Sequence, residues 1–263
     1  MSLKPTKRRK AATDNPAPGA DLLFGLHAVQ AALEAPVSRV AEIWLADERH
    51  DQRVNSVIAT AQSLGITTHK ISRKDLDQMV PEGRHQGCVA RVTPLEPLSE
   101  TDLDQLLDNL SETPFLLILD GVQDPHNLGA CLRTAEAAGA HAVIAPKDRA
   151  SSLTTTAIKI SSGSAERVPF VQVTNLARVL RELQQRGIWL VGTSGDCDTG
   201  LYQADLTGPL ALILGAEGKG IRRLTRDHCD AVVYIPMQGQ AESLNVSVAA
   251  GVCLFEAQRQ RSL

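Results

Sequence analysis

Residues 116–145 constrain the fold of this chain more than any other segment. Four apolar residues run into Asp120 and Gly121, a polar turn follows at residues 122–127, and an alanine-rich segment extends to Gly139. This order predicts a buried strand, a turn, a helix and a second strand. Because ligands of open α/β sheets bind where strands end, the polar turn is a candidate functional site.

Apolar runs of strand length alternate with helical patterns throughout residues 115–263. This alternation predicts an α/β domain with a mostly parallel sheet covered on both faces. Residues 21–93 alternate in the same way and predict a smaller α/β domain, whose segment 22–36 is expected to be one helix stopped by a proline. The prolines and the acidic helix of residues 94–114, capped by Ser99, predict a linker.

The charge of the chain is distributed unevenly. The first ten residues contribute +5 to a net charge of −3, which leaves about −8 on the remainder. The remainder is too acidic for a globally basic nucleic-acid binder, so nucleic-acid affinity must come from local patches. Residues 1–20 predict a disordered basic arm, which is either an electrostatic RNA contact or an inert solvated tail.

The cysteine pattern and the hydropathy indicate a cytosolic protein. The five cysteines include no CxxC pair and no zinc-type spacing, which favours free thiols in a reducing compartment. No apolar run approaches 18 residues, so neither a signal peptide nor a membrane span is expected.

Three predicted strands end in unusual polar turns. The first turn supplies Asn127 and Arg133, the second spans residues 215–220, and the third spans residues 236–245. Three such turns at the strand ends of one domain predict a pocket.

The second turn has the spacing G-x-x-G-x-G, which differs from the dinucleotide fingerprint G-x-G-x-x-G. Its Glu217 would repel a pyrophosphate, so a ligand without phosphate, such as S-adenosylmethionine (AdoMet), suits the turn better. An exposed turn carboxylate is the plainer interpretation of Glu217.

The other polar residues have structural alternatives. Asn127 can be a helix N-cap, and Ser243 and Asn245 can cap the last helix, although an amide at an apolar helix start needs partners. Arg133 can be solvated or paired with Glu136, or it can hold a phosphate or a ribose hydroxyl.

Segment 146–167 is rich in basic, Ser and Thr residues. It can line a nucleic-acid backbone or form a solvated loop. Aromatic residues make up only 3% of the chain, so base stacking is not the main recognition mode. The basic residues of the segment are Lys147, Arg149, Lys159 and Arg167.

The segments DPHNLGACLRTAEAAG, LGAEGKGIRRLT and IPMQGQAESLNVSVAAGVCLFEA resemble, in order, the three signature motifs of the SpoU/TrmH-type RNA ribose 2′-O-methyltransferases of the SPOUT superfamily. Residues 21–93, with GLHAVQAALE and HQGCVARV, resemble the L30e-like substrate-binding domain of these enzymes. Together they are similar to the bacterial 23S rRNA guanosine-2′-O-methyltransferase subgroup. Many relatives lack the basic arm, so the resemblance gives it no role.

The resemblance implies a C-terminal SPOUT domain with a trefoil knot, which no pattern rule would propose. It also implies a homodimer with the site near its interface, and AdoMet bound in the knotted loops against Gly215, Ile235 and Leu244. No metal is implied.

The implied reaction is methyl transfer from AdoMet to the ribose 2′-hydroxyl of a guanosine in 23S rRNA. The resemblance assigns its catalytic pocket to Asn127, Arg133, Glu217, Ser243 and Asn245. Because the pKa of arginine exceeds about 12, Arg133 is favoured as stabiliser of the developing alkoxide, and an arginine base activated by the substrate phosphate is the alternative. A tRNA methyltransferase of the same fold and a non-catalytic RNA-binding protein are the competing functions.

Overall fold

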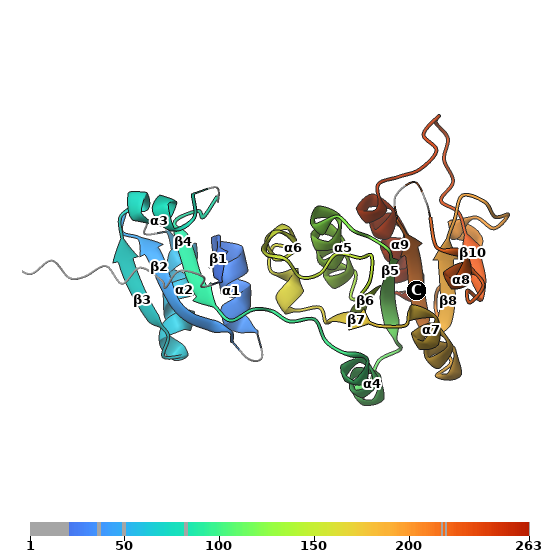
Figure 1. Ribbon diagram of the computed structural model, residues 1–263, viewed down its shortest axis with the longest axis horizontal. Coiled ribbons are helices and arrows are strands. Elements are labelled where there is room, and N and C mark those ends of the chain that lie inside the picture. The colour runs from blue at the N-terminus through green and yellow to red at the C-terminus, as the bar shows by residue number, and fades with distance from the viewer. Residues whose placement is uncertain are drawn as a thin grey trace, which may run out of the picture.

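The computed structural model describes residues 21–35, 38–48, 51–81, 84–216, 218 and 220–262. They form two α/β units, each built around its own sheet (Figure 1). The predicted basic arm of residues 1–20 lies outside the described residues, as do Glu217 and Lys219 of the glycine-rich turn.

The small unit contains a four-stranded sheet in the order β1-β4-β2-β3, in which only the β2–β3 pairing is parallel. Its elements are β1 (Leu22–Phe24), α1 (Leu26–Glu34), β2 (Val40–Ala46), α2 (Gln52–Ser63), β3 (Thr67–Ile71), α3 (Arg73–Met79) and β4 (Cys88–Val92).

The prediction of one helix over residues 22–36 is wrong in its first part. Residues 22–24 form strand β1, which pairs antiparallel with β4, and α1 begins only after Gly25. Gly25 has φ +96°, a conformation that favours glycine and lets the chain turn from strand to helix within one residue. Three strand residues are too few to show a period of two, so the apolar run looked helical.

The segment between the two units is attached to the large one. Helix α4 (Glu100–Asn109) begins with the predicted cap, since the Ser99 hydroxyl accepts from the Asp102 amide in a capping box. Just before it, Leu98 forms a parallel bridge with Val171 of the large sheet.

The large unit contains a six-stranded sheet in the order β10-β8-β9-β5-β6-β7, and its described pairings are all parallel, as predicted. Its elements are β5 (Phe115–Asp120), α5 (Pro125–Ala137), β6 (Ala142–Pro146), α6 (Thr155–Ile160), the 3₁₀ turn η1 (Ser164–Glu166), β7 (Phe170–Val173), α7 (Leu176–Gln185), β8 (Trp189–Thr193), η2 (Leu201–Gln203), β9 (Leu210–Gly215), α8 (Arg223–Arg226), β10 (Ala231–Val233) and α9 (Val246–Arg261).

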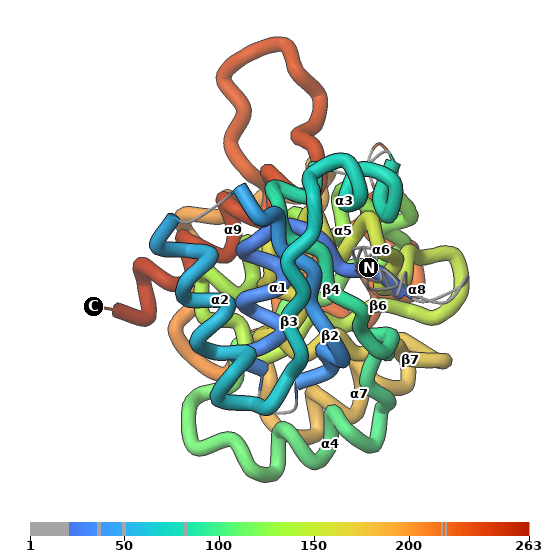
Figure 2. The backbone as a smooth tube through the Cα atoms, turned by 90° about the vertical axis from the view of Figure 1, so that its left-hand side faces the viewer, coloured from blue at the N-terminus to red at the C-terminus, as the bar shows by residue number. Residues whose placement is uncertain are grey.

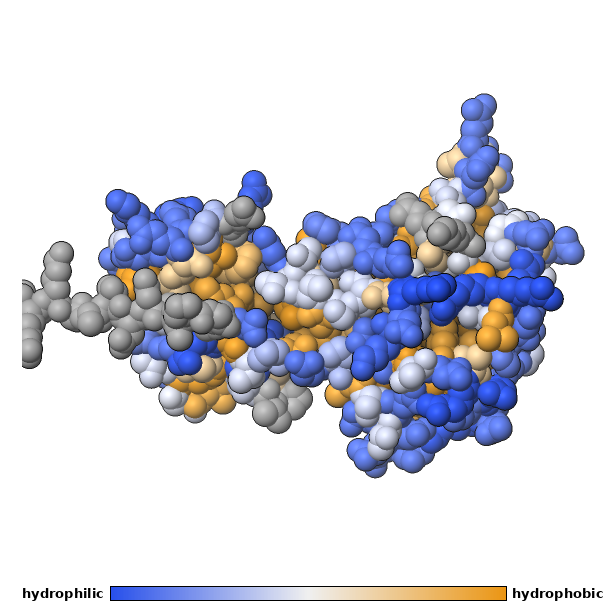
Figure 3. Space-filling view, viewed as in Figure 1, coloured by the Kyte–Doolittle hydropathy of each residue, from blue (hydrophilic) through white to orange (hydrophobic). Residues whose placement is uncertain are grey.

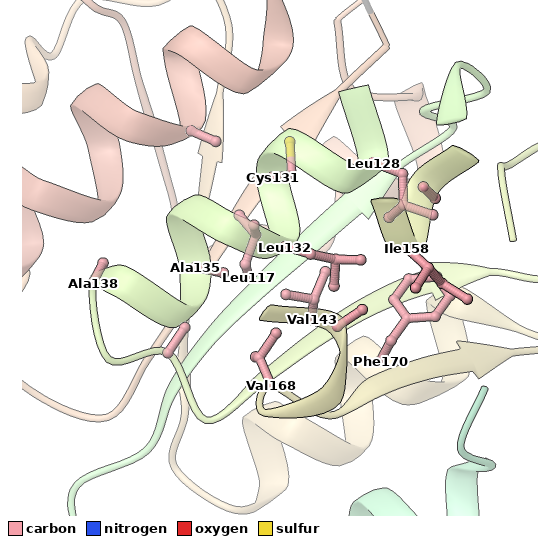
Figure 4. Packing of buried hydrophobic residues seen from close by; sticks show 14 of the residues in the cluster. Leu117, Leu128, Cys131, Leu132, Ala135, Ala138, Val143, Ile158, Val168 and Phe170 are labelled. Atoms are coloured by element: carbon pink, nitrogen blue, oxygen red, sulfur yellow. The ribbon is translucent and has the colours of Figure 1, made fainter. Parts of the chain in front are cut away.

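Alternate residues of the central strands enter two separate cores. Leu117 and Leu119 of β5 pack with α5 and α9, whereas Leu116 and Ile118 pack with α4 and α7. Figure 4 shows side chains of the first core gathered between α5 and the sheet. Burial on both faces explains why these strands are continuously apolar.

The sheet order positions the polar turns. Strands β5 and β9 are neighbours in register, with Asp120 opposite Gly215, so their turns emerge side by side. The third turn leaves β10 and returns into α9, which packs against α5 and β9. This third segment stands out from the large unit (Figures 1 and 2), and its tip is hydrophilic (Figure 3). Within the described part of the chain, no helix is both long and apolar enough for a membrane span.

Candidate active site

The first and third polar turns are joined by a side-chain hydrogen bond. Asn245 Nδ2 donates to Asn127 Oδ1 over 2.9 Å. The same Asn245 caps α9, because its Oδ1 accepts from the Ser247 amide at 2.9 Å and from the Ser247 hydroxyl at 2.6 Å. The predicted cap role of Asn245 is therefore confirmed. Both the nitrogen and the oxygen of its side-chain amide have hydrogen-bond partners. The cap is not Ser243, which lies exposed two residues earlier.

The expectation that Asn127 caps α5 is wrong. The cap is Asp124, whose Oδ1 accepts from the His126 amide at 2.9 Å, and Pro125 occupies the first helical position. The Asp-Pro pair starts the helix earlier than the apolar pattern alone suggested. Asn127 therefore lies inside the first turn, with its side chain free to join α9.

A cavity of about 630 Å³ lies between the carboxyl ends of β8, β9 and β10 and the segment that precedes α9. The three residues expected to touch AdoMet all line this cavity, and so does Ser243. Its lining combines apolar side chains, glycine backbone and polar side chains, among them Asp196, Gly215, Ile235, Glu242, Ser243 and Leu244.

Backbone contact determines the shape of the cavity at Gly215. A Cβ on Gly215 would lie 1.8 Å from the carbonyl carbon of Gly220 and 2.1 Å from the amide of Ile221. The turn is closed by the Gly220 amide, which donates to the Ala216 carbonyl over 2.9 Å. Only glycine permits this approach, so the turn folds directly back onto the end of β9.

A buried carboxylate supports the same turn. Asp120, whose side chain is fully buried, accepts from the Arg222 amide at 2.8 Å and from Arg222 Nε at 2.6 Å. From the sequence, Asp120 was expected only to end a strand. The sequence did contain a signal for this ion pair, namely a carboxylate directly after an apolar run. Such a carboxylate is liable to be buried, and a buried charge needs a partner.

Arg133 stands apart from the cavity lining. It is exposed and lies six residues after Asn127, which at about 100° per residue places it roughly 240° further around α5. The alternative of a pairing with Glu136 is not formed, since Glu136 instead accepts from the Ser164 hydroxyl and lies 3.9 Å from Arg167. Among the described residues, none forms an ion pair or side-chain hydrogen bond with Arg133, so its guanidinium is available to a ligand.

The charged side chains among the described lining residues of the cavity are the carboxylates Asp196 and Glu242, and both are exposed. Asp196 also lies 3.8 Å from Arg226, so Glu242 is the carboxylate of the two that keeps its charge for a cationic ligand. Glu217, predicted to contribute a further carboxylate, lies outside the described residues. Burial raises the pKa of the Cys131, Cys229 and Cys253 thiols to about 12, so none of the three is a thiolate nucleophile at neutral pH.

The basic segment 146–167 divides into two halves. Lys159 Nζ lies 4.6 Å from the centre of the Phe24 ring, and Arg167 lies 4.0 Å from Glu34, so both reach the small unit. Lys147 and Arg149 are exposed and follow the end of β6. A Cβ on Gly121 would lie 3.9 Å from the Arg149 carbonyl, which places Arg149 beside the end of β5.

Comparison with known proteins identifies relatives over nearly the whole chain. Residues 114–255 match the SpoU rRNA Methylase family, and residues 22–98 match the family described as RNA 2′-O ribose methyltransferase substrate binding. The chain is 57% identical over 240 residues to the 23S rRNA (guanosine-2′-O-)-methyltransferase RlmB of Pseudomonas syringae, covering 91% of this chain and 96% of that protein. It is 55% identical to the protein of the same name from Shewanella oneidensis, covering 92% and 98%.

A solved structure has the same architecture. The SpoU methyltransferase AviRb from Streptomyces viridochromogenes, crystallised with the cofactor AdoMet, superposes with a TM-score of 0.74 at 26% identity, covering 93% of this chain and 91% of that one.

Proposed function

This chain belongs to the SpoU rRNA Methylase family, and on that premise we propose that it transfers the methyl group of AdoMet to the ribose 2′-hydroxyl of a guanosine in 23S rRNA. The observation that carries the proposal is the 57% identity over 91% of the chain to an enzyme of that name. The large unit would perform the transfer, and the small unit would bind the RNA.

The cavity fits AdoMet in size and chemistry. Its volume of about 630 Å³ lies within the roughly 300–1,000 Å³ of small-molecule sites. Glu242 in the lining suits a ligand that carries a sulfonium and an amino group, whereas Asp196 is already paired with Arg226. Ile235 and Leu244 supply apolar walls for the adenine, and the glycine-rich turn at Gly215 offers backbone groups to a ligand without phosphate.

When bound, AdoMet supplies an electrophilic methyl group on its sulfonium. The residues of this chain must then hold the 2′-hydroxyl in line with that methyl group and stabilise the oxygen as its proton leaves. We assign stabilisation to Arg133, whose free guanidinium can bind both the ribose oxygen and the adjoining phosphate. We assign orientation of the pocket to Asn127, Asn245 and Ser243, and the orienting role of Glu217 remains part of the proposal.

We further propose that the chain works as a homodimer through α9. One face of this helix is buried, yet Val248 and Phe255, seven residues apart on another face, are 52% and 47% exposed. A second copy covering these side chains would remove an apolar stripe from water. Light scattering of Val248→Glu and Phe255→Glu variants tests this, because a dimer held by this face should dissociate.

The knot, the domain division and the cellular location complete the proposal. The C-terminal segment is proposed to thread the trefoil knot of SPOUT domains, supported by the return of α9 to β9 and α5 after β10, and an experimental structure tests it.

The domain division proposed is a basic arm at 1–20, an RNA-binding domain at 21–93, a linker at 94–114 and a methyltransferase domain at 115–263. The location proposed is the cytoplasm, and a substrate in ribosomal RNA supports it.

The deciding experiment is transfer of labelled methyl groups to unmodified 23S rRNA fragments and to tRNA, followed by nucleoside analysis. We expect labelled 2′-O-methylguanosine from 23S rRNA alone. Label in tRNA would contradict 23S rRNA as the substrate, and label on a base would contradict the ribose 2′-hydroxyl as the methyl acceptor. Absence of label in both RNAs, with RNA binding intact, would favour a non-catalytic RNA-binding protein.

A further inference from the structure

A buried ion pair joins the small unit to the large one. Arg39, next to β2, donates from Nη2 to Glu166 Oε1 at 2.7 Å and from Nε to both Glu166 oxygens at 3.0 and 3.2 Å. The two side chains are 9% and 2% exposed. A guanidinium and a carboxylate that meet in this two-point geometry fix direction as well as distance.

Arg39 also binds the start of the segment that connects the two units. Arg39 Nη1 donates to the Thr93 carbonyl at 2.6 Å. At the other end, the Leu98 amide donates to the Phe170 carbonyl at 2.8 Å. Only residues 94–97 lie between these two anchors, and two of the four are prolines with fixed φ. The connection is therefore short and stiff while the ion pair is formed.

Close packing of the backbone reinforces the contact. A Cβ on Gly163, at the start of η1, would lie 2.5 Å from the Ala31 Cβ and 3.3 Å from the His27 carbonyl. Helix α1 of the small unit therefore rests directly against this glycine, and α6 lies on the side of the large unit that faces the small unit in Figure 1. The Lys159–Phe24 contact described above lies on the same side.

The other side of η1 packs on the helix that carries the proposed catalytic arginine. The Ser164 hydroxyl donates to Glu136 Oε2 at 3.3 Å, and Glu136 lies three residues after Arg133 in α5. One short turn, residues 163–166, thus contacts α1 of the small unit and α5 of the large unit.

We propose that Arg39 and Glu166 are positioning residues that hold the small unit at one distance and angle from α5. RNA bound to the small unit would then present its target ribose to Arg133. A buried ion pair suits this role because it is satisfied in a single arrangement, whereas apolar surfaces can slide. The statement about RNA rests on the proposed function, and the statement about the two units does not.

The test uses the full chain with Arg39→Ala, Glu166→Gln and the exchanged pair Arg39→Glu with Glu166→Arg. The matched control is Arg186→Ala, which removes an arginine paired with Asp104 and Asp108 on the exposed surface. Small-angle X-ray scattering reports the separation of the units, methyl transfer at varied 23S rRNA concentration reports KM and kcat, and calorimetry reports AdoMet affinity.

We expect both single variants to increase the radius of gyration and to raise the KM for RNA about tenfold. AdoMet affinity and kcat at saturating RNA should stay within about twofold of wild type. The exchanged pair should recover most of both changes, and Arg186→Ala should resemble wild type.

Unchanged scattering in folded Arg39→Ala and Glu166→Gln would overturn the proposal whatever their activity. Changes in KM that the exchanged pair leaves uncorrected, or that appear together with lost AdoMet affinity, would also overturn it. Absence of methyl transfer by the wild type would instead contradict the proposed function, and the scattering result would still decide whether the pair holds the units together.

Discussion

Asn127 and Asn245 are 118 residues apart in the sequence and meet through a 2.9 Å hydrogen bond between their side-chain amides. Asn245 also begins α9, so the bond connects the first turn of α5 to the first turn of the last helix. The contact between the first and third polar turns therefore depends on two distant side chains, and neither asparagine is among the described residues that line the cavity.

Breaking this bond should impair catalysis without removing the helix cap. Asn245→Ser keeps an oxygen that can cap α9 and is too short to reach Asn127, and Asn127→Ala removes the acceptor. We expect each variant to lower kcat about tenfold, and the double variant to be no worse than either, because both remove one bond. Asn245→Ala should lose a further ~1 kcal/mol of unfolding free energy, measured with urea. If the double variant instead lowered kcat by the product of the two single losses, the two residues would act independently, and the shared role would be contradicted.

Arg133→Ala should abolish most methyl transfer and leave AdoMet binding intact. The reason is that Arg133 lies outside the cavity lining and is free to contact the RNA. Removing one such stabilising donor typically costs about 10²–10³ in kcat. The control is Arg181→Ala on α7, an exposed arginine whose Nε donates to the Ala177 carbonyl of its own helix. Loss of AdoMet affinity in a folded Arg133→Ala protein would make the assigned role untenable.

Leu244→Arg should prevent AdoMet binding. Leu244 lines the cavity, and a guanidinium there would fill its volume and repel a sulfonium. Leu244→Met is the matched control, since it keeps the volume and the apolar character. Calorimetry should show no heat of binding for the first variant and near wild-type affinity for the second. Retained affinity in Leu244→Arg would place the cofactor elsewhere.

Gly215→Ala should destabilise the large unit and abolish cofactor binding together. Its Cβ would collide with the backbone of Gly220 and Ile221, which cannot move aside as a side chain could. A loss on the order of 3 kcal/mol or more in unfolding free energy is expected for such strain. Gly208→Ala is the control, because a Cβ there meets nothing within 4 Å. Equal stability of the two variants in urea would disprove the collision.

Glu256 should contribute to acid stability. Hydrogen bonds from Arg259 and Gln260 lower the pKa of Glu256 from 4.5 to about 2. A pKa that is lower in the folded state stabilises the protein above about pH 5, and that contribution is lost as the pH falls toward 2. Glu256→Gln should therefore cost about 1–2 kcal/mol at pH 7, less than the full pKa shift implies because solvent screens the pair with the exposed Arg259, and much less at pH 2. Urea titrations at both values test this, with the exposed Glu182→Gln as control. An equal cost at both pH values would refute the linkage.

Local signals in the sequence were enough for most elements of the fold. The Ser99 cap lies where predicted, because a helix start depends on residues close in the chain. The parallel sheet followed from its continuous apolar strands. The short strand β1 was missed for the converse reason, since its pairing with β4 joins segments more than sixty residues apart.

The sequence by itself determined which residues are polar at the strand ends and the family that their motifs resemble. Only the tertiary structure decided how they meet. Neighbouring β5 and β9 place Asp120 beside the glycine-rich turn, and the return of α9 brings Asn245 to Asn127. It also decided that Lys159 and Arg167 reach toward the small unit, whereas Arg133 stays free. Burial and pairing are properties of contacts between distant segments, and no local pattern of residues encodes them.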